Sequence, residues 1–316
     1  MAGNNEQWEN VRERGSLRAM QLLFWCYRHG GRHLIYPVVC VVVFYFFLTR
    51  RATRRSSARY LRRALGKPAS TWLVWRHHLA FGRALVDRLG AWMGRIQRTD
   101  VTFPGHAHMS ELQAQKTGAV LLGAHFGNLE MCRALVENDG SLKLNVILHT
   151  ANTENFNQLV RRASERAEVR LIQVRDVSPA TAMMLKEKLD QGEFLILLAD
   201  RLPPGEGQRW LEAPFLGDTA RFPAGPFWLA LMLGAPVYFM AGYTAKEGYR
   251  AELQPLYAGG KVGRKERDAY CQRILSDYIA NLERLCRDYP LQWFNFYDYW
   301  NDEQHLPAGE TPDNDR

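Results

Sequence analysis

The sequence predicts an α/β fold: a mostly parallel sheet with helices on both faces, preceded by an N-terminal hydrophobic helix that anchors the protein to a membrane. Two observations predict the sheet and its helices. Short apolar runs alternate with segments of helical periodicity, and turn residues separate these runs and segments. A third observation predicts the anchor, since arginines flank an uncharged apolar run near the N-terminus on both sides.

The anchor is predicted from residues 34–48, LIYPVVCVVVFYFFL, which carry no charge. As a helix this run would extend about 22 Å, less than the membrane hydrocarbon core of about 30 Å. It would therefore span the bilayer with arginine side chains reaching outward from its ends, or lie in the interface. Arg50 and Arg51 follow it where a signal peptide would carry a small-residue cleavage site. A buried core helix is the alternative that we favour less.

The positive charge of the chain is concentrated in its first part. The net charge is +8, but residues 1–66 hold twelve arginines and three acidic residues, so residues 67–316 together carry a charge of −1. A basic protein often binds nucleic acid. Here the arginines surround the apolar run, so we expect an anionic cytoplasmic membrane leaflet as the partner and no nucleic acid.

We expect three parts along the chain: a basic membrane anchor at residues 1–66, a main domain at residues 67–304, and a disordered acidic tail at residues 305–316. A linker near Gly66 and Pro68 separates the first two parts. Apolar runs predict strands at residues 119–124, 144–149, 169–174, 194–199 and 236–243. Helical patterns cover residues 131–136, 155–166, 178–191, 222–233 and 264–286.

The segment HFGNLE, residues 125–130, joins the first predicted strand to a helix. Loops at strand ends hold functional groups on a rigid frame, so His125 is well placed to take a proton from a substrate. Glu130, in the first turns of the helix, can fold back and orient the imidazole as the third member of a catalytic triad does. Asn128 is placed to cap the helix or to stabilise an oxyanion. The alternative is a packing histidine beside an unrelated surface glutamate.

Other polar residues follow strands or precede helices. Asp200 and Arg201 come directly after the fourth predicted strand, where a solvated turn with a surface ion pair is the alternative. Thr219 and Arg221 lie in a glycine-containing loop before a helix, which suits anion binding or a plain structural turn. Arg175 follows the third predicted strand and is a weaker candidate of the same kind.

Several signatures are absent from the sequence. No GxSxG nucleophile motif and no Walker A motif occur, which argues against a serine hydrolase of that class and against a P-loop nucleotide site. His77-His78 and His106-x-His108 have no matching ligand set, so we expect no metal. The five cysteines form no CxxC pair, which favours a reducing compartment. The aromatic residues 293–300 read as core, with a lipid-facing wall as the alternative.

The motif His125–four residues–Glu130 after a buried strand resembles the signature of the lysophospholipid acyltransferase superfamily. More narrowly, the chain resembles the bacterial lipid A biosynthesis (lauroyl and myristoyl) acyltransferases. The blocks LLADRLPPG, APFLGDTARFPAGP and YPLQWFNFYDYW agree with that family in order and spacing, and the resemblance covers about residues 20–300. The chain departs from the family in having Arg201 after Asp200 and in lacking an arginine close behind Trp293, which bears on the acceptor more than on the reaction.

The resemblance implies a membrane-bound O-acyltransferase of the bacterial inner membrane, with the domain at 67–304 facing the cytoplasm. It would move a fatty acyl chain from acyl-carrier protein or acyl-CoA to a hydroxyl of a lipid acceptor such as a lipid A precursor, without a cofactor. His125 would be the general base and Glu130 its orienting partner. Substrate-binding positions would be Asn128, Arg175, Asp200, Arg201, Thr219 and Arg221. The alternatives are a lysophospholipid, glycolipid or other lipid head as acceptor, a non-catalytic lipid-binding protein, and a soluble thioester hydrolase.

Overall fold

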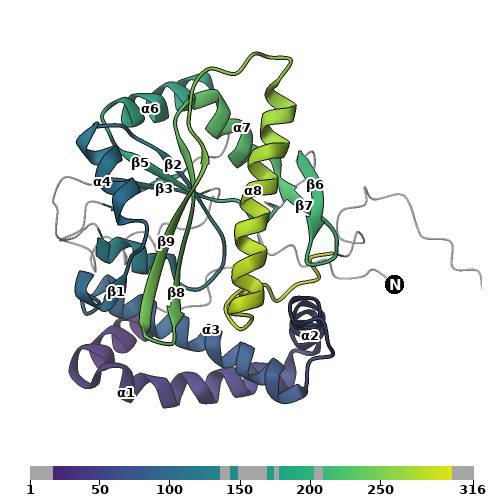
Figure 1. Cartoon of the computed structure of the whole chain (residues 1–316). Coiled ribbons are helices and arrows are strands. Elements are labelled where there is room, and N and C mark those ends of the chain that lie inside the picture. The colour runs from purple at the N-terminus through teal and green to yellow at the C-terminus, as the bar shows by residue number, and fades with distance from the viewer. Residues whose placement is uncertain (1–16, 136–142, 149–168, 174–177, 203–208, 301–316) are drawn as a thin grey trace, which may run out of the picture.

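The computed structural model describes residues 17–135, 143–148, 169–173, 178–202 and 209–300 (Figure 1). Within these ranges the main sheet has the strand order β1-β9-β8-β2-β5-β3-β4. Its strands are β1 (Val101–Thr102), β2 (Val120–Gly123), β3 (Leu144–Leu148), β4 (Val169–Gln173), β5 (Phe194–Leu198), β8 (Val237–Ala245) and β9 (Gly248–Tyr257). Every neighbouring pair is parallel except β8 and β9, which are antiparallel, so the fold is mixed α/β with a mostly parallel sheet.

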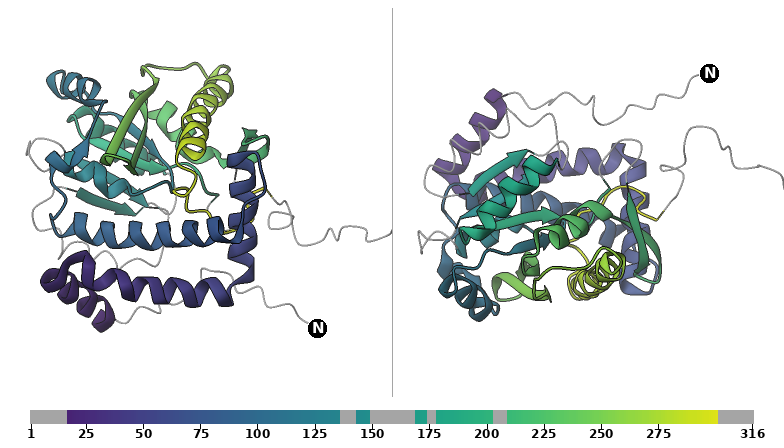
Figure 2. Two further views of the ribbon diagram at one scale, coloured as in Figure 1. Left: turned by 60° about the horizontal axis from the view of Figure 1, so that its bottom comes forward. Right: turned by 90° about the horizontal axis from the view of Figure 1, so that it is seen from above.

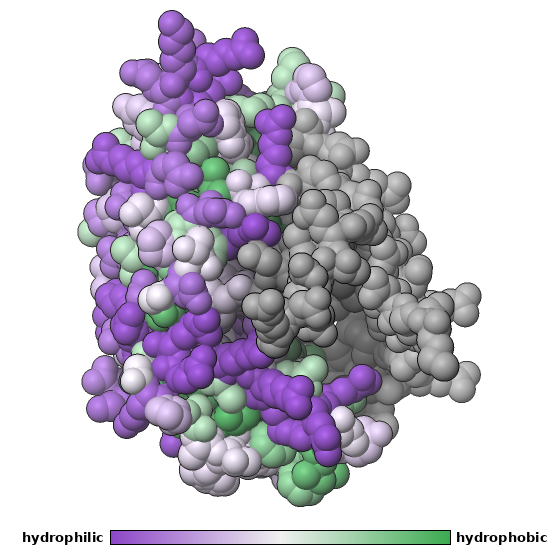
Figure 3. Space-filling view, turned by 90° about the vertical axis from the view of Figure 1, so that its right-hand side faces the viewer, coloured by the Kyte–Doolittle hydropathy of each residue, from purple (hydrophilic) through white to green (hydrophobic). Residues whose placement is uncertain are grey.

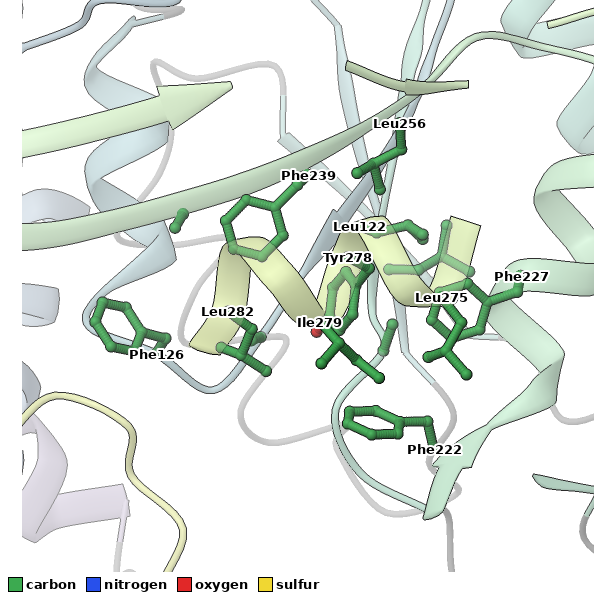
Figure 4. Packing of buried hydrophobic residues seen from close by; sticks show 14 of the residues in the cluster. Leu122, Phe126, Phe222, Phe227, Phe239, Leu256, Leu275, Tyr278, Ile279 and Leu282 are labelled. Carbon is green, nitrogen blue, oxygen red and sulfur yellow. The ribbon is translucent and has the colours of Figure 1, made fainter. Parts of the chain in front are cut away.

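Two clusters of apolar side chains cover the two faces of this sheet, because alternate residues of a strand point to opposite sides. Val120 and Leu122 of β2 belong to the larger cluster, together with side chains of α6 (Pro179–Asp190), α7 (Ala224–Leu233) and α8 (Arg267–Asp288). Leu121 belongs to the other cluster, with side chains of α4 (His106–Ala114) and of the 3₁₀ helix η3 (Leu129–Leu135). Figure 4 shows Leu275, Tyr278 and Leu282 of α8 among the side chains of the larger cluster.

The five predicted strands are confirmed as β2, β3, β4, β5 and β8. Three predicted helices are confirmed as α6, α7 and α8, with ends shifted by at most three residues. The helix expected at residues 131–136 is the 3₁₀ helix η3 instead of an α-helix. The helix expected at residues 155–166 lies outside the described residues.

The prediction of a loop at residues 215–226 was wrong. The structure has an antiparallel hairpin there, formed by β6 (Trp210–Phe215) and β7 (Asp218–Pro223). Leu216 and Gly217 connect the strands with φ angles of 51° and 84°, and two positive φ angles are typical of a type I′ turn. The sequence has Leu-Gly at this turn and not the Asn-Gly or Gly-Gly that usually signals a hairpin. Leucine rarely adopts a positive φ, so the local sequence does not predict the hairpin. Strand β9 was likewise not predicted.

The N-terminal region consists of α1 (Leu17–Thr49), α2 (Arg51–Leu65) and α3 (Thr71–Trp92). Helix α1 kinks at Gly31, which has a φ of 60°, and its stretch His29–Thr49 is long and apolar enough to cross a membrane. α1 runs beside α3 (Figure 2). Gly82 of α3 permits this approach, because a Cβ atom there would lie 2.8 Å from a methyl group of Val39.

Helix α2 is amphipathic and shares the core of the main domain. Tyr60, Leu61 and Ala64 are buried in the same cluster as the sheet and α8. Its arginines lie on the other sides, and Arg63 forms an ion pair with Asp218 at 2.7 Å. Helix α2 thus packs against the main domain, and the boundary between anchor and main domain at residue 66 stays a prediction.

Candidate active site

Two neighbouring strands bring His125 and Asp200 to the same edge of the sheet. β2 and β5 are parallel, and their last residues, Gly123 and Leu198, are register partners. His125 and Asp200 each follow two residues later, at the carboxyl ends of the strands. Ligands of open α/β sheets bind outside this edge.

The imidazole of His125 and the carboxylate of Asp200 are joined directly. The distance between His125 Nδ1 and Asp200 Oδ1 is 2.8 Å, and the backbone N–H of His125 donates to Asp200 Oδ2 at 2.9 Å. Trp293 donates its indole Nε1–H to the same Oδ2 at 3.0 Å. Asp200 is fully buried, whereas 33% of the His125 side chain is exposed. The Nδ1 edge of the imidazole is thus held against the protein interior, and the rest of the ring is accessible to solvent.

The electrostatic surroundings keep Asp200 ionised. Burial raises the pKa of its carboxyl, but the charge and hydrogen bonds of His125 and the guanidinium of Arg201 outweigh burial and lower the pKa to about 2. An ionised carboxylate only accepts hydrogen bonds, so the neutral imidazole carries its proton on Nδ1. Nε2 is then an acceptor, and no hydrogen-bond partner for it is found in the described part of the chain. This is the arrangement of a histidine general base with an orienting carboxylate.

Gly127 fixes the loop that carries His125. Its φ is 59°, and a Cβ atom there would lie 2.2 Å from the carbonyl oxygen of Gly242 in β8. The next backbone N–H, that of Asn128, donates to this carbonyl at 2.7 Å. Glycine is therefore required at the centre of the HFGNLE segment, because a side chain would push the loop away from β8.

A second segment, Gln292–Phe294, runs antiparallel to the His125 loop. Gly127 N–H donates to Gln292 O at 2.7 Å, and Phe294 N–H donates to His125 O at 2.9 Å. The Trp293 ring is fully buried, 5.0 Å from the ring of Tyr60 and 5.2 Å from that of Phe215. The aromatic residues near the C-terminus are therefore partly core, as predicted, and Trp293 also contributes a polar contact to the site.

Arg201 lies beside this second segment. Its Nη2 donates to Phe294 O at 2.5 Å, and its guanidinium carbon is 5.7 Å from the centre of the Tyr297 ring. Arg201 is partly buried. Its positive charge therefore acts on Asp200 from within the protein, where screening by water is weak.

The expected contact between Glu130 and His125 is not formed. The two residues share no hydrogen bond or ion pair in the described structure, and Asp200 occupies the Nδ1 side where Glu130 was expected. The physical reason is the geometry of η3, which starts at Leu129 and directs the backbone N–H of Glu130 to Asn128 Oδ1 at 3.1 Å. A catalytic role for Glu130 stays a prediction.

The backbone and the side chain of Asn128 differ in their hydrogen bonding. Its backbone N–H is occupied by Gly242, and the N–H of Gly127 is occupied by Gln292, so these amides are not free to bind an oxyanion. The Asn128 side chain is buried, and its Nδ2 has no hydrogen-bond partner among the residues that the structure describes. A buried donor of this kind requires an explanation, and a substrate oxygen is one.

Two further predicted residues, Thr219 and Arg221, do not join this group. Thr219 and Arg221 lie in β7, where Arg221 Nε is 3.0 Å from Glu212 Oε1 of β6 and the guanidinium covers the Trp210 ring. Arg175 lies outside the described residues. Within the described ranges, no three His, Cys, Asp or Glu side chains are arranged to hold a metal ion.

The sequence pattern contains a signal for the Asp200–His125 contact. Each residue follows a buried strand at the same offset, and parallel neighbours end at one edge of a sheet. The pattern does not say which strands are neighbours, and 75 residues separate His125 from Asp200. Trp293 has no local signal, because its role depends on a segment that packs against the loop from far along the chain.

Comparison with known families gives one match that spans most of this architecture. A profile described as bacterial lipid A biosynthesis acyltransferase matches residues 73–301. The matched region contains His125, Asp200 and Trp293. No curated protein matches the chain.

Proposed function

Because the chain belongs to the bacterial lipid A biosynthesis acyltransferase family, we propose that it is a membrane-bound enzyme that moves a fatty acyl chain from a thioester donor to a lipid hydroxyl, with His125 as general base. The family is one of acyltransferases, so a transferase activity with a lipid acceptor is implied by membership. The observation that carries the choice of base is the 2.8 Å contact between His125 and the buried Asp200.

In the proposed reaction, His125 Nε2 accepts the proton of the acceptor hydroxyl while the hydroxyl oxygen attacks the carbonyl carbon of the thioester. The new C–O bond gives a tetrahedral oxyanion, which collapses as the C–S bond breaks. The imidazolium then returns the proton to the leaving thiolate. Asp200 stays ionised throughout and stabilises the imidazolium that forms. The Asn128 Nδ2 group is our candidate donor to the oxyanion, since a developing charge is best stabilised by a fixed, buried donor.

We propose acyl-carrier protein or acyl-CoA as the donor and a lipid A precursor as the acceptor. A lysophospholipid, a glycolipid or another lipid head is the alternative acceptor. Arg201, Thr219, Arg221 and Arg175 remain proposed substrate-binding residues, and of these Arg201 directly follows Asp200 in the chain.

We further propose that α1 and α2 hold the enzyme at the cytoplasmic face of the bacterial inner membrane. Large apolar side chains that α1 exposes are those of Trp25, Leu34, Val38, Val41, Val42, Phe44, Tyr45, Phe46 and Leu48. In Figure 3 hydrophobic side chains gather at the lower edge of the molecule, where α1 lies in Figure 1, below a band of hydrophilic side chains. An apolar edge beside arginines is suited to an anionic bilayer.

Acyl transfer by the purified protein tests the proposal. The protein is incubated with a labelled acyl-carrier thioester or acyl-CoA and with each acceptor lipid, and labelled products are identified by mass spectrometry. We expect transfer by the wild type and a loss of at least about a hundredfold in His125→Ala, since the base is removed. Transfer at near wild-type rate by a folded His125→Ala protein would refute the mechanism, and release of free fatty acid alone would identify a thioesterase.

A further inference from the structure

Two buried polar residues connect the N-terminal helices to the segment that carries Trp293. Ser57 lies in α2 and His77 in α3, and both are fully buried. Ser57 Oγ is 2.7 Å from His77 Nδ1, and His77 Nε2 is 3.0 Å from the carbonyl oxygen of Trp293. The contacts form one continuous chain from α2 through α3 to the tryptophan whose indole donates to Asp200.

The chemistry of the partners determines where the protons lie. The carbonyl of Trp293 only accepts, so His77 Nε2 carries a proton and donates it. Burial, with a smaller contribution from His78, lowers the pKa of His77 to about 3, so the imidazole is neutral at neutral pH. Its Nδ1 is therefore an acceptor, and the hydroxyl of Ser57 is the donor to it. Both nitrogens of His77 are satisfied in a single tautomer.

The surroundings of His77 are otherwise aromatic. Its ring is stacked on that of Phe294, with centres 6.1 Å apart, and lies 4.9 Å from the ring of Phe296 and 5.5 Å from that of Tyr60. Rings that need no hydrogen bond thus form most of these surroundings. A buried imidazole costs free energy unless both nitrogens are paired, so its use here indicates that the hydrogen bond to Trp293 matters.

Trp293 is thereby held on two sides. His77 fixes its carbonyl, and Asp200 receives its indole proton. Oδ2 of Asp200 accepts only two hydrogen bonds among the described residues, from Trp293 and from the backbone of His125. Loss of the indole donor would leave the buried carboxylate with weaker support on the side away from the His125 ring, and small changes of orientation at a general base are costly.

We propose that His77, oriented by Ser57, is a positioning residue of the acyl-transfer site, acting through Trp293 on Asp200. The inference rests on the proposed function of His125 and Asp200 and extends the site to the helices at the N-terminal side of the fold. His77 does not touch the reacting atoms.

Two substitutions separate positioning from packing. His77→Phe keeps an aromatic ring against Phe294 and removes the donor to Trp293. His77→Gln loses the ring but can place an amide N–H near the position of Nε2. A packing role predicts that the Phe variant is the better tolerated, whereas the positioning role predicts the opposite.

The first readout is the indole N–H resonance of Trp293 in protein labelled with ¹⁵N-tryptophan, assigned with Trp293→Phe. We expect His77→Phe to shift this resonance upfield and to speed its hydrogen exchange about tenfold, and His77→Gln to restore both toward wild type. The second readout is acyl transfer, for which we expect kcat about tenfold lower in His77→Phe, KM within about twofold, and recovery in His77→Gln. Ser57→Ala should change both readouts in the same direction, by less.

An unchanged indole resonance and kcat in a folded His77→Phe protein would overturn the inference. So would a His77→Gln protein that folds and behaves like His77→Phe in both readouts. His125→Ala, measured in parallel, decides the proposed function separately. If that variant still transferred acyl chains, the role of His125 would fail, while the indole resonance would still report whether His77 controls the Trp293–Asp200 contact.

Discussion

At the scale of single residues, the site depends on a carboxylate that is buried yet ionised. Asp200 has no exposed surface, and His125, Trp293 and Arg201 supply the donors and charge that stabilise it there. A group with this environment in a catalytic role orients the histidine without itself gaining a proton. The glycine at position 127 is equally specific, because the backbone of Gly242 lies where its side chain would be.

We predict that Asp200→Asn reduces acyl transfer at least about a hundredfold, since the imidazole loses its fixed tautomer. It should also lower the free energy of unfolding. Because the folded pKa of Asp200 is about 2 and the ordinary value is 3.8, its stabilising contribution is complete above about pH 4 and disappears as the pH falls to about 2. The expected difference at neutral pH is on the order of 2 kcal/mol.

Denaturant unfolding of wild type and Asp200→Asn at several pH values between about 2 and 8 measures this difference. A difference that stays constant across the range would contradict the assigned ionisation. Asp200 should add no step to the pH profile of kcat/KM between about pH 5 and 9, because it remains ionised there.

At the scale of elements, the hairpin β6–β7 supports the same aromatic core that holds Trp293. Phe215 is fully buried at the end of β6 and packs on both Trp293 and Phe222. The turn that closes the hairpin places Gly217 at a φ of 84°, with open space where a Cβ would lie. Replacing Gly217 by alanine therefore costs free energy only through the backbone conformation.

We predict that Gly217→Ala lowers the free energy of unfolding by about 1 kcal/mol, because alanine disfavours a positive φ. Gly225→Ala is the matched control. Gly225 lies in the first turn of α7 and also has open space around it, but its φ is not positive, so alanine should stabilise the protein by about 0.5–1 kcal/mol. Opposite shifts of the thermal midpoint are expected, and two shifts of the same sign would contradict the type I′ turn.

At the scale of the whole molecule, the apolar edge of α1 and the arginines of α2 meet at one end of the fold. A cavity of about 390 Å³ there is lined by Phe47, Arg51, Arg54, Arg55, Ala58, Ala69, Thr71 and Val74. Arg54 donates to the carbonyls of Phe47 and Leu48 and so closes the end of α1, whereas Arg51 and Arg55 are exposed. Positive charge above an apolar floor is suited to a lipid phosphate group.

We predict that Arg55→Gln weakens binding to vesicles containing phosphatidylglycerol about tenfold, because a charge-assisted contact in the cavity is lost. Arg62→Gln removes the same charge from an exposed position of α2 outside the cavity, and we expect it to weaken binding less than about threefold. Co-sedimentation with vesicles measures both. Equal weakening by the two substitutions would show that the arginines act only as a diffuse charge.

Apolar runs and helical periodicity in the sequence determined five parallel strands, three of the helices and the N-terminal apolar helix, because periodicity and local composition are properties of short segments. They also placed His125 and Asp200 at strand ends. Only the tertiary structure decided that β2 and β5 are neighbours, and therefore that Asp200 and not Glu130 contacts His125. The hairpin with Leu216 in its turn, strand β9 and the polar chain from Ser57 to Trp293 likewise had no local signal. The hairpin strands and β9 pair with strands adjacent to them in the sequence. The polar chain joins residues far apart in the sequence, so no single segment encodes it.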